Sequence, residues 1–248
     1  MRYALISDIH EDIVHLKLAL KKIEKQKCDV IICLGDVSGF SVPHYHYYDT
    51  RNAHECLRIV RENCAIIIAG NHDLHAARKV PQINPHYPYP DNWYQMDYHQ
   101  RLLASNGKVW LFDNDELNPL YTTDDVDFLK TLPEYHILNT PHGNVLLSHY
   151  TYPNLTGSMR GFYSSADEFE AHRLYMALAN CFLSFTGHRH YMGLYITTTS
   201  GILQKRHNRR YTPEPMDCIM VPPITHSQIG NGFCIYDIEQ KSVITHLI

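Results

Sequence analysis

Five short segments of this chain carry side chains that bind metal ions, and each follows an apolar run. In chain order they are Asp8-Ile9-His10, Gly35-Asp36, Gly70-Asn71-His72-Asp73, Ser148-His149 and Gly187-His188-Arg189-His190. Imidazole favours transition metals, whereas carboxylate and amide oxygens hold harder ions. A mixed Asp, Asn and His set therefore predicts a site for moderately hard, Lewis-acidic metal ions.

Hydrolysis of a phosphate ester is the chemistry that fits such a set. Two divalent ions about 3.5–4 Å apart polarise the phosphoryl oxygens, and a water between them becomes hydroxide near neutral pH. One oxygen ligand must touch both ions, and a carboxylate does so without strain. The residues alone thus favour a two-metal hydrolytic site.

The spacing within two of the segments is also informative. Asp8 and His10 flank a single residue, so in an extended segment their side chains point to the same side. The same period places His188 and His190 on one face and aims Arg189 away from it, which leaves Arg189 as a candidate cation nearby. Any one of these short patterns is most often a solvated or capping polar pair, but five of them in order at strand exits favour a joint site.

The elements around the first three segments predict how these side chains come together. Apolar runs at residues 2–7, 30–34 and 65–69 indicate buried strands, and amphipathic patterns at 11–25 and 51–62 indicate helices. This alternation is typical of parallel β-α-β units with right-handed crossovers, hence an α/β fold. Ligand sites in such sheets lie beyond the carboxyl ends of the strands, where each segment begins.

The rest of the chain predicts one domain, residues 1–248, with an insertion. Residues 81–121 are rich in aromatic residues and proline, which disfavours a regular helix there, and we expect them to lie over one edge of the fold. Further elements are expected at 123–132 (helix), 136–138 and 144–148 (a strand pair), 165–180 (helix) and 181–186 (strand). Strands at 191–199, 217–221, 232–236 and 242–247 suggest a second sheet of mixed or antiparallel pairing.

Composition excludes several classes of partner. The formal net charge is −4, so the chain lacks the basic footprint of a duplex nucleic-acid binder and the charge that anionic membranes attract. No apolar run is long enough for a signal peptide or a membrane span. Seven scattered cysteines without a C-x-x-C pattern are typical of reduced thiols, and we expect a cytoplasmic protein.

Taken together, the five segments resemble the calcineurin-like metallophosphoesterases motif for motif, from residue 2 to about residue 193. The resemblance implies a four-layer α-β-β-α sandwich with two mixed sheets and a dinuclear metal site at the strand ends. It assigns Asp8, His10, Asp36 and His190 to one metal, and Asp36, Asn71, His149 and His188 to the other, with Asp36 as the bridge. Two divalent ions are implied; we expect Mn²⁺, with Fe, Zn, Ni and Co as alternatives.

The resemblance also implies roles for the remaining polar residues of the third segment. His72 is the non-ligand that interacts with the phosphate and assists the leaving oxygen, while a metal-bridged hydroxide attacks phosphorus. Asp73 would orient the His72 imidazole, as carboxylates beside a metal site do for histidine.

The chain departs from the family pattern in three places. Between His188 and His190 it carries Arg189 where a smaller residue is common. Protein serine/threonine phosphatases carry Asp-Arg-Gly shortly after Gly-Asp, whereas this chain has Gly35-Asp36-Val37-Ser38-Gly39, which favours a bacterial or archaeal phosphodiesterase-type branch. Many bacterial relatives carry Asn-Pro-Gly-Ser in a late turn, where residues 221–227 here read Val-Pro-Pro-Ile-Thr-His-Ser.

Substrate preference depends on the segments expected to rim the site, 38–50, 81–121 and 150–164. They are rich in Tyr, His, Trp and Asn and poor in Lys and Arg, which suits a small phosphodiester with an organic face, a nucleotide being one candidate. One alternative is a non-catalytic scaffold on the same fold; such scaffolds typically lack the counterpart of His72, which is present here. A dinuclear amidase or peptidase is a third hypothesis, but the order of the five segments in this chain resembles that class of enzyme poorly.

Overall fold

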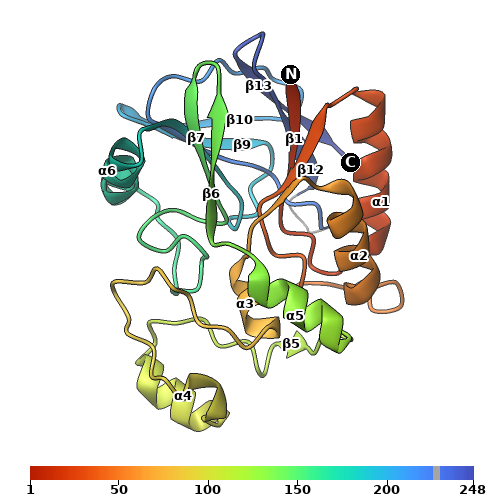
Figure 1. Cartoon of the computed structure of the whole chain (residues 1–248), viewed down its shortest axis with the longest axis vertical. Helices are drawn as coiled ribbons and strands as arrows, with labels where there is room; N and C mark the ends of the chain where they lie inside the picture. Colours follow the sequence, from red (N-terminus) through yellow and green to blue (C-terminus); the bar gives the residue numbers. More distant parts are fainter. Residues whose placement is uncertain (226–229) are drawn as a thin grey trace.

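The computed structural model describes residues 1–225 and 230–248. Of the late turn at 221–227, His226 and Ser227 therefore lie outside the described residues. Two β-sheets pack against each other, and helices cover the outer face of each (Figure 1). No helix in the described ranges is both long and apolar enough to span a bilayer.

The first sheet has five strands in the order β13-β12-β1-β2-β4. Its parallel strands are β1 (Arg2–Ile6), β2 (Val30–Cys33) and β4 (Ile66–Ile67), which alternate along the chain with helices α1 (Ile13–Lys25) and α2 (Ala53–Asn63). The predicted β-α-β units are confirmed, because apolar runs and amphipathic helices alternate in the local sequence.

Strands β12 (Gly232–Asp237) and β13 (Ser242–Leu247) complete this first sheet. β12 runs antiparallel to β1, with Tyr3 opposite Tyr236. The expectation that these two strands belong to the second sheet is wrong. Order along the chain does not say which edge a late strand joins, and without β12 one edge of β1 would present unpaired backbone groups.

The second sheet has six strands in the order β10-β9-β11-β8-β7-β6. They are β6 (Tyr135–Thr140), β7 (Gly143–Ser148), β8 (Cys181–Thr186), β9 (Leu194–Thr198), β10 (Gly201–Lys205) and β11 (Asp217–Met220). β8 pairs in parallel with both β7 and β11, and the remaining pairs are antiparallel. The predicted mixed sheet is confirmed, but the edge strand β10 was not expected.

Hydrophobic side chains account for the four layers. Leu5 of the first sheet and Phe185 of the second belong to one buried cluster between the sheets. Leu16 of α1 packs with residues of α2 on the outer face of the first sheet. On the outer face of the second sheet, Met176 of α6 (Glu170–Leu178) packs with Leu146. The α-β-β-α order implied by the resemblance is confirmed.

The segment 81–121 lies beyond one end of the sheets, where α4 is drawn in Figure 1. It contains a short 3-10 helix (Trp93–Gln95), α4 (Tyr98–Ser105) and β5 (Glu116–Leu117), which pairs with β3 (Phe40–Ser41). The expectation of no regular helix is wrong for α4: four of the five prolines of the segment precede it and Pro119 follows it, and the Asp97 side chain caps it by accepting from the backbone N–H of Gln100 at 2.9 Å. The helices α3 (Asn71–Ala76) and α5 (Thr123–Thr131) connect this end to the sheets.

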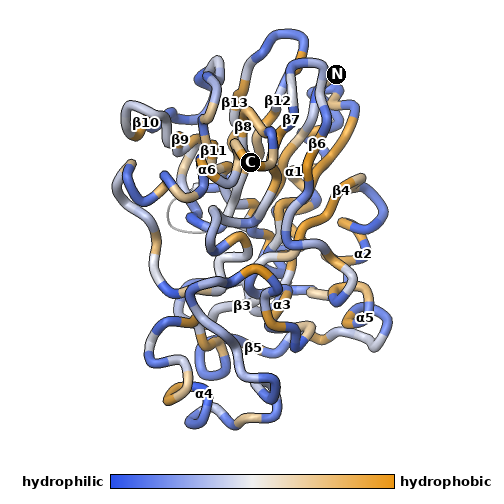
Figure 2. Tube along the Cα trace, turned by 60° about the vertical axis from the view of Figure 1, so that its left-hand side comes forward, coloured by the Kyte–Doolittle hydropathy of each residue, from blue (hydrophilic) through white to orange (hydrophobic). Residues whose placement is uncertain are grey.

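The insertion has a small hydrophobic core of its own. Tyr87, Trp93 and Val109 are buried there and pack with the partly buried Tyr94 and Met159. Figure 2 shows the hydrophobic stretches concentrated along the strands of the two sheets, while the trace around α4 is mixed. The aromatic richness of residues 81–121 therefore serves mainly to pack the segment onto the fold.

Candidate metal centre

All seven predicted ligands lie at the carboxyl ends of strands that face the same end of the molecule. Asp8 and His10 follow β1, Asp36 follows β2, and Asn71 begins α3 just after β4. From the second sheet, His149 follows β7, and His188 and His190 follow β8. The packing of the two sheets therefore brings together residues that are far apart in the sequence.

One half of the site contains Asp8, His10 and His190, whose candidate ligand atoms lie within 4.8 Å of one another. His190 Nε2 lies 3.3 Å from Asp8 Oδ1 and 3.1 Å from His10 Nε2. His10 Nε2 in turn lies 3.9 Å from Asp36 Oδ2, which connects this half to the other.

The other half contains Asp36, His149 and His188, again within 4.8 Å. His149 Nε2 lies 3.0 Å from Asp36 Oδ2. Asn71 Oδ1 and His188 Nε2 are buried and have no hydrogen-bond partner among the described residues. A buried polar atom without a partner is costly, and a metal ion is a partner that both atoms can ligate. The donor set therefore fits two metal ions.

The backbone at the ligands is unusual, because Asp8, His10, Asp36, His188 and His190 all have φ between 49° and 68°. This left-handed region is uncommon for residues other than glycine and costs roughly 1 kcal/mol or more at each position. Asp8 and His10 were expected to point to the same side because their segment is extended. Their side chains do converge, but the segment is not extended. Tight turns at the strand exits, and not the strand period, bring the two side chains together.

Neighbouring groups orient the ligands. His149 Nδ1–H donates to the Leu34 carbonyl at 2.8 Å and His10 Nδ1–H to the Gly39 carbonyl at 2.9 Å, which leaves each Nε2 free for a metal. The backbone N–H of His188 donates to Asp8 Oδ2 at 3.0 Å. Gly70 is required for space, since a Cβ there would lie 2.0 Å from Asp36 Oδ1.

The two aspartates and His149 form an ionised cluster, whereas burial lowers the pKa of His10 to about 3 and that of His188 well below its usual range. Burial would raise the pKa of the Asp36 carboxyl, but the imidazoles of His149 and His72 override it and hold that pKa well below its usual range. Burial would lower the pKa of His149, but the Asp36 carboxylate raises it to about 9. In the absence of metal the site therefore holds a proton on His149, and metal binding must displace it.

His72 lies beside this cluster and has a partner that the sequence did not reveal. Its Nε2 is 3.8 Å from Asp36 Oδ2, while its Nδ1 forms an ion pair with the buried carboxylate of Glu116 in β5. Burial would lower the pKa of His72, but Glu116 and then Asp36 raise it to about 9. No motif marks Glu116, because it lies in the weakly patterned insertion.

The position of Asp73 differs from the expectation. Its carboxylate accepts hydrogen bonds from the backbone N–H groups of Asp36 at 2.8 Å, Ser38 at 3.0 Å and Gly70 at 3.1 Å. Burial and the Asp36 charge raise the pKa of Asp73 to about 6. Asp73 holds the loops after β2 and β4 together, and the carboxylate against the His72 imidazole is Glu116.

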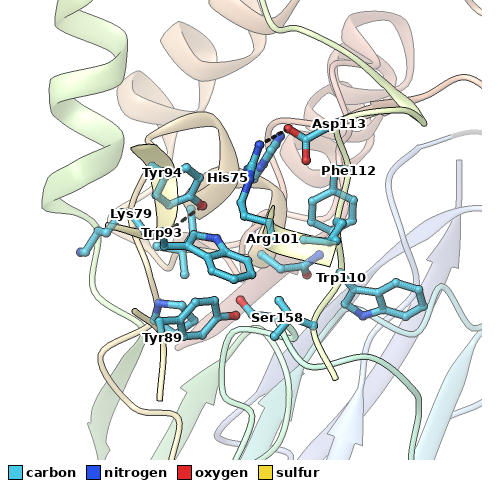
Figure 3. Close-up of a pocket in the computed structure, with 15 residues that line it drawn as sticks. His75, Lys79, Tyr89, Trp93, Tyr94, Arg101, Trp110, Phe112, Asp113 and Ser158 are labelled. Atoms are coloured by element: carbon cyan, nitrogen blue, oxygen red, sulfur yellow. Dashed lines mark hydrogen bonds and ion pairs between the residues drawn. The ribbon is translucent and has the colours of Figure 1, made fainter. Parts of the chain in front are cut away.

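Two further expectations concern the rim of the site: one is the direction of Arg189, and the other is the role of the aromatic residues in 81–121. Arg189 points away from the ligands as expected, although the left-handed backbone at His188 and His190, and not a strand period, sets its direction. Its guanidinium lies 4.5 Å from the Tyr195 ring centre and donates to the Tyr163 carbonyl. Figure 3 shows Tyr89, Trp93 and Tyr94 clustered on one side of a cavity of about 20 Å³, near the Arg101–Asp113 ion pair. That volume holds a water molecule and not a base.

Comparisons with known proteins show the family and the fold. A family model described as calcineurin-like phosphoesterase matches residues 1–192. A metallophosphoesterase from Sphaerobacter thermophilus superposes with a TM-score of 0.65 at 18% identity, covering 100% of this chain and 88% of that chain. A hypothetical protein from Pyrococcus horikoshii OT3 superposes with a TM-score of 0.60 at 14% identity, covering 100% and 87%.

A curated relative matches over a shorter stretch. An uncharacterized protein of Methanocaldococcus jannaschii is 33% identical over 70 residues, which are 28% of this chain. The match spans 25% of the length of that relative.

Proposed function

We propose, from the premise that this chain belongs to the calcineurin-like phosphoesterase family, that it hydrolyses phosphodiesters with the help of two bound divalent metal ions. The observation that carries the proposal is the convergence of seven ligand side chains, two of which present buried atoms without a partner among the described residues. Phosphoester hydrolysis is the chemistry of the family.

We assign the ligands to two overlapping sets. Asp8, His10 and His190 would hold one ion, and Asn71, His149 and His188 the other, with the Asp36 carboxylate shared between them. Bound there, the ions would polarise the phosphoryl oxygens and lower the pKa of a water molecule. The presence of carboxylate and amide oxygens beside imidazole favours Mn²⁺ among the candidate metals.

His72 is the residue we assign to the leaving group. Its Nδ1–H faces Glu116, so the proton on Nε2 is the one available to the oxygen that leaves phosphorus. Glu116 keeps that imidazole charged and fixes its orientation, which makes Glu116 a positioning residue.

The charges around the site favour a diester over a monoester. A dianionic monoester is usually met by several fixed cations. Arg189 is held against Tyr195 and the Tyr163 carbonyl, and Arg51 pairs with Glu11 at 3.2 Å, so neither guanidinium is directed at the ligands. A phosphodiester carries one negative charge and needs less compensation.

The test compares two chromogenic substrates under identical metal and pH. With Mn²⁺, kcat/KM for bis(p-nitrophenyl) phosphate should exceed that for p-nitrophenyl phosphate. A clear preference for the monoester would contradict the diesterase assignment and leave phosphoester hydrolysis standing. Hydrolysis of neither substrate with Mn, Fe, Zn, Ni or Co would instead indicate a non-catalytic scaffold.

A further inference from the structure

The loop at residues 150–164 lies directly over the second half of the site. At Gly157, where φ is +77°, a Cβ would lie 2.5 Å from His188 Cε1 and 2.9 Å from Asn71 Oδ1. Five residues later, the Phe162 ring centre lies 5.2 Å from that of His188. The Phe162 side chain is 47% exposed, an unusual position for a phenyl ring in contact with a candidate metal ligand.

This loop pairs with the insertion. Val109 and Met159 form an antiparallel bridge, flanked by hydrogen bonds from Trp110 N–H to the Ser158 carbonyl at 3.0 Å and from Arg160 N–H to the Lys108 carbonyl at 2.8 Å. Side chains alternate across such a bridge. Val109 and Met159 accordingly enter the small core of the insertion, and Trp110 and Arg160 lie on the opposite face.

On that face an aromatic surface adjoins Phe162. The ring centres of Trp110 and Phe162 are 6.3 Å apart, and the Arg160 guanidinium lies 5.6 Å from the Trp110 ring. In Figure 3 the Trp110 indole extends away from Tyr89, Trp93 and Tyr94. We call Trp110, Arg160 and Phe162 the aromatic platform.

The platform and His72 lie at different ends of the site. Phe112, two residues beyond Trp110, packs against His72 with ring centres 4.2 Å apart, and His72 is itself 4.8 Å from His10 of the other half. The segment 110–112 therefore connects the platform beside His188 to the imidazole assigned to the leaving group. A diester lying across the two halves would direct its leaving group to His72 and its other ester group to Phe162.

We propose that the aromatic platform binds a planar aromatic group, such as a nucleobase, on the ester oxygen that stays on phosphorus. The proposal rests on the phosphodiesterase function. Every nucleobase presents a π face that stacks on an aromatic side chain, and an arginine at the edge adds cation–π attraction. The preferred substrate class is then a nucleotide-bearing phosphodiester, with the nucleoside monophosphate as one product.

The kinetic test uses two diesters with the same leaving group. Thymidine 5′-(p-nitrophenyl phosphate) carries a base, and methyl p-nitrophenyl phosphate does not; both yield p-nitrophenol as water adds to phosphorus and the bond to the leaving oxygen breaks. Phe162→Ala should lower kcat/KM about tenfold for the thymidine ester, mainly by raising KM, and should change kcat/KM for the methyl ester by less than about twofold. Phe162→Trp should retain the preference for the thymidine ester. The matched control is Leu103→Ala, at an exposed position of α4, which should behave like the wild type.

A binding test supplies a readout that does not depend on hydrolysis. Thymidine 5′-monophosphate should quench tryptophan emission in the Mn²⁺-loaded protein, more weakly in Phe162→Ala and not at all in Trp110→Phe, in which only the buried Trp93 remains. Methyl phosphate should not quench.

The two tests separate the two proposals. Hydrolysis of both diesters at equal relative rates in wild type and Phe162→Ala, without quenching, would overturn the platform and leave the phosphodiesterase standing. Quenching without hydrolysis of either diester would overturn the phosphodiesterase and retain the base-binding surface.

Discussion

Among single residues, Asp36 connects the two halves of the site. Its Oδ2 lies 3.0 Å from His149 Nε2 and 3.9 Å from His10 Nε2, and its Oδ1 accepts from the His72 backbone N–H at 3.0 Å. Asp36 lies within ligand distance of His149 and His188 on one side, and of His10 and His72 on the other. One carboxylate thus lies between both sets of imidazoles.

Asp36→Asn should weaken the binding of both metal ions, because the shared ligand loses its charge and one of its two equivalent oxygens. We expect elemental analysis to show loss of both ions, whereas Asp124→Asn, at an exposed position of α5, should bind metal like the wild type. Full metal content in Asp36→Asn would contradict the shared role.

His72→Ala should separate catalysis from metal binding. We expect unchanged metal content and a fall in kcat of about 10²–10⁴, the range typical of removing an acid–base group. His72 also lies within ligand distance of His10 and Asp36, so loss of metal in this variant would identify it as a ligand.

Glu116→Gln should affect esters according to their leaving groups. Glutamine preserves the shape but not the charge that favours a proton on His72. Turnover of an alkyl phosphodiester, whose leaving oxygen needs a proton, should fall by about tenfold, less than the 10²–10⁴ expected for loss of the acid–base group, because His72 itself remains. Bis(p-nitrophenyl) phosphate should be affected much less, and equal losses on both esters would argue for a merely structural role.

At the scale of elements, α6 anchors the loop that covers the site. The buried His172 accepts from the Tyr152 backbone N–H at 2.9 Å through Nδ1, so its Nε2–H faces Ser184 Oγ of β8, also at 2.9 Å. One neutral imidazole thus connects α6, β8 and the loop at 150–164. Burial, with a smaller contribution from Arg173, lowers the pKa of His172 from 6.5 to about 3.

His172 should therefore make stability depend on pH. Between about pH 3 and 6.5 the unfolded chain binds a proton that the folded chain does not, so the free energy of unfolding falls as the pH falls through this window. From pH 7 to 5 the loss is about 2 kcal/mol. His172→Asn, which retains an acceptor for Tyr152 N–H, should lose correspondingly less in urea titrations at the two pH values; identical losses would contradict this assignment.

For the whole molecule, metal binding should stabilise the fold, because the complete site exists only when both sheets are packed together. Purified protein should contain about two divalent ions per chain. Chelation should lower Tm by about 5–10 °C if the metal is present at about a hundred times its Kd, and Mn²⁺ should restore both Tm and activity. Unchanged Tm and activity after complete removal of metal would contradict a metal-dependent site.

We also propose that residues 1–248 form one domain. The cluster between the sheets contains strands from both the beginning and the end of the chain, so neither sheet buries its inner face alone. Thermal unfolding of the metal-loaded protein should show one transition, and two separated transitions would indicate independent units.

The sequence predicts those features that depend on residues close together in the chain. The ligand segments were predictable because each lies beside an apolar run, and parallel strands bring their carboxyl ends to one edge of the sheet. The helices at 13–25 and 53–63 were predictable for the same reason, since amphipathic spacing lies within a few turns. Segment order together with family resemblance was enough to identify the fold and to propose the ligand set.

Only the tertiary structure decided the pairings between distant segments. It placed β12 beside β1, Glu116 against His72, and Asp73 on backbone amides of two loops. It also divided the aromatic residues into a packed core around Trp93 and an exposed surface at Phe162. None of these contacts has a local pattern, because each depends on how chain segments far apart in sequence meet when the sheets pack.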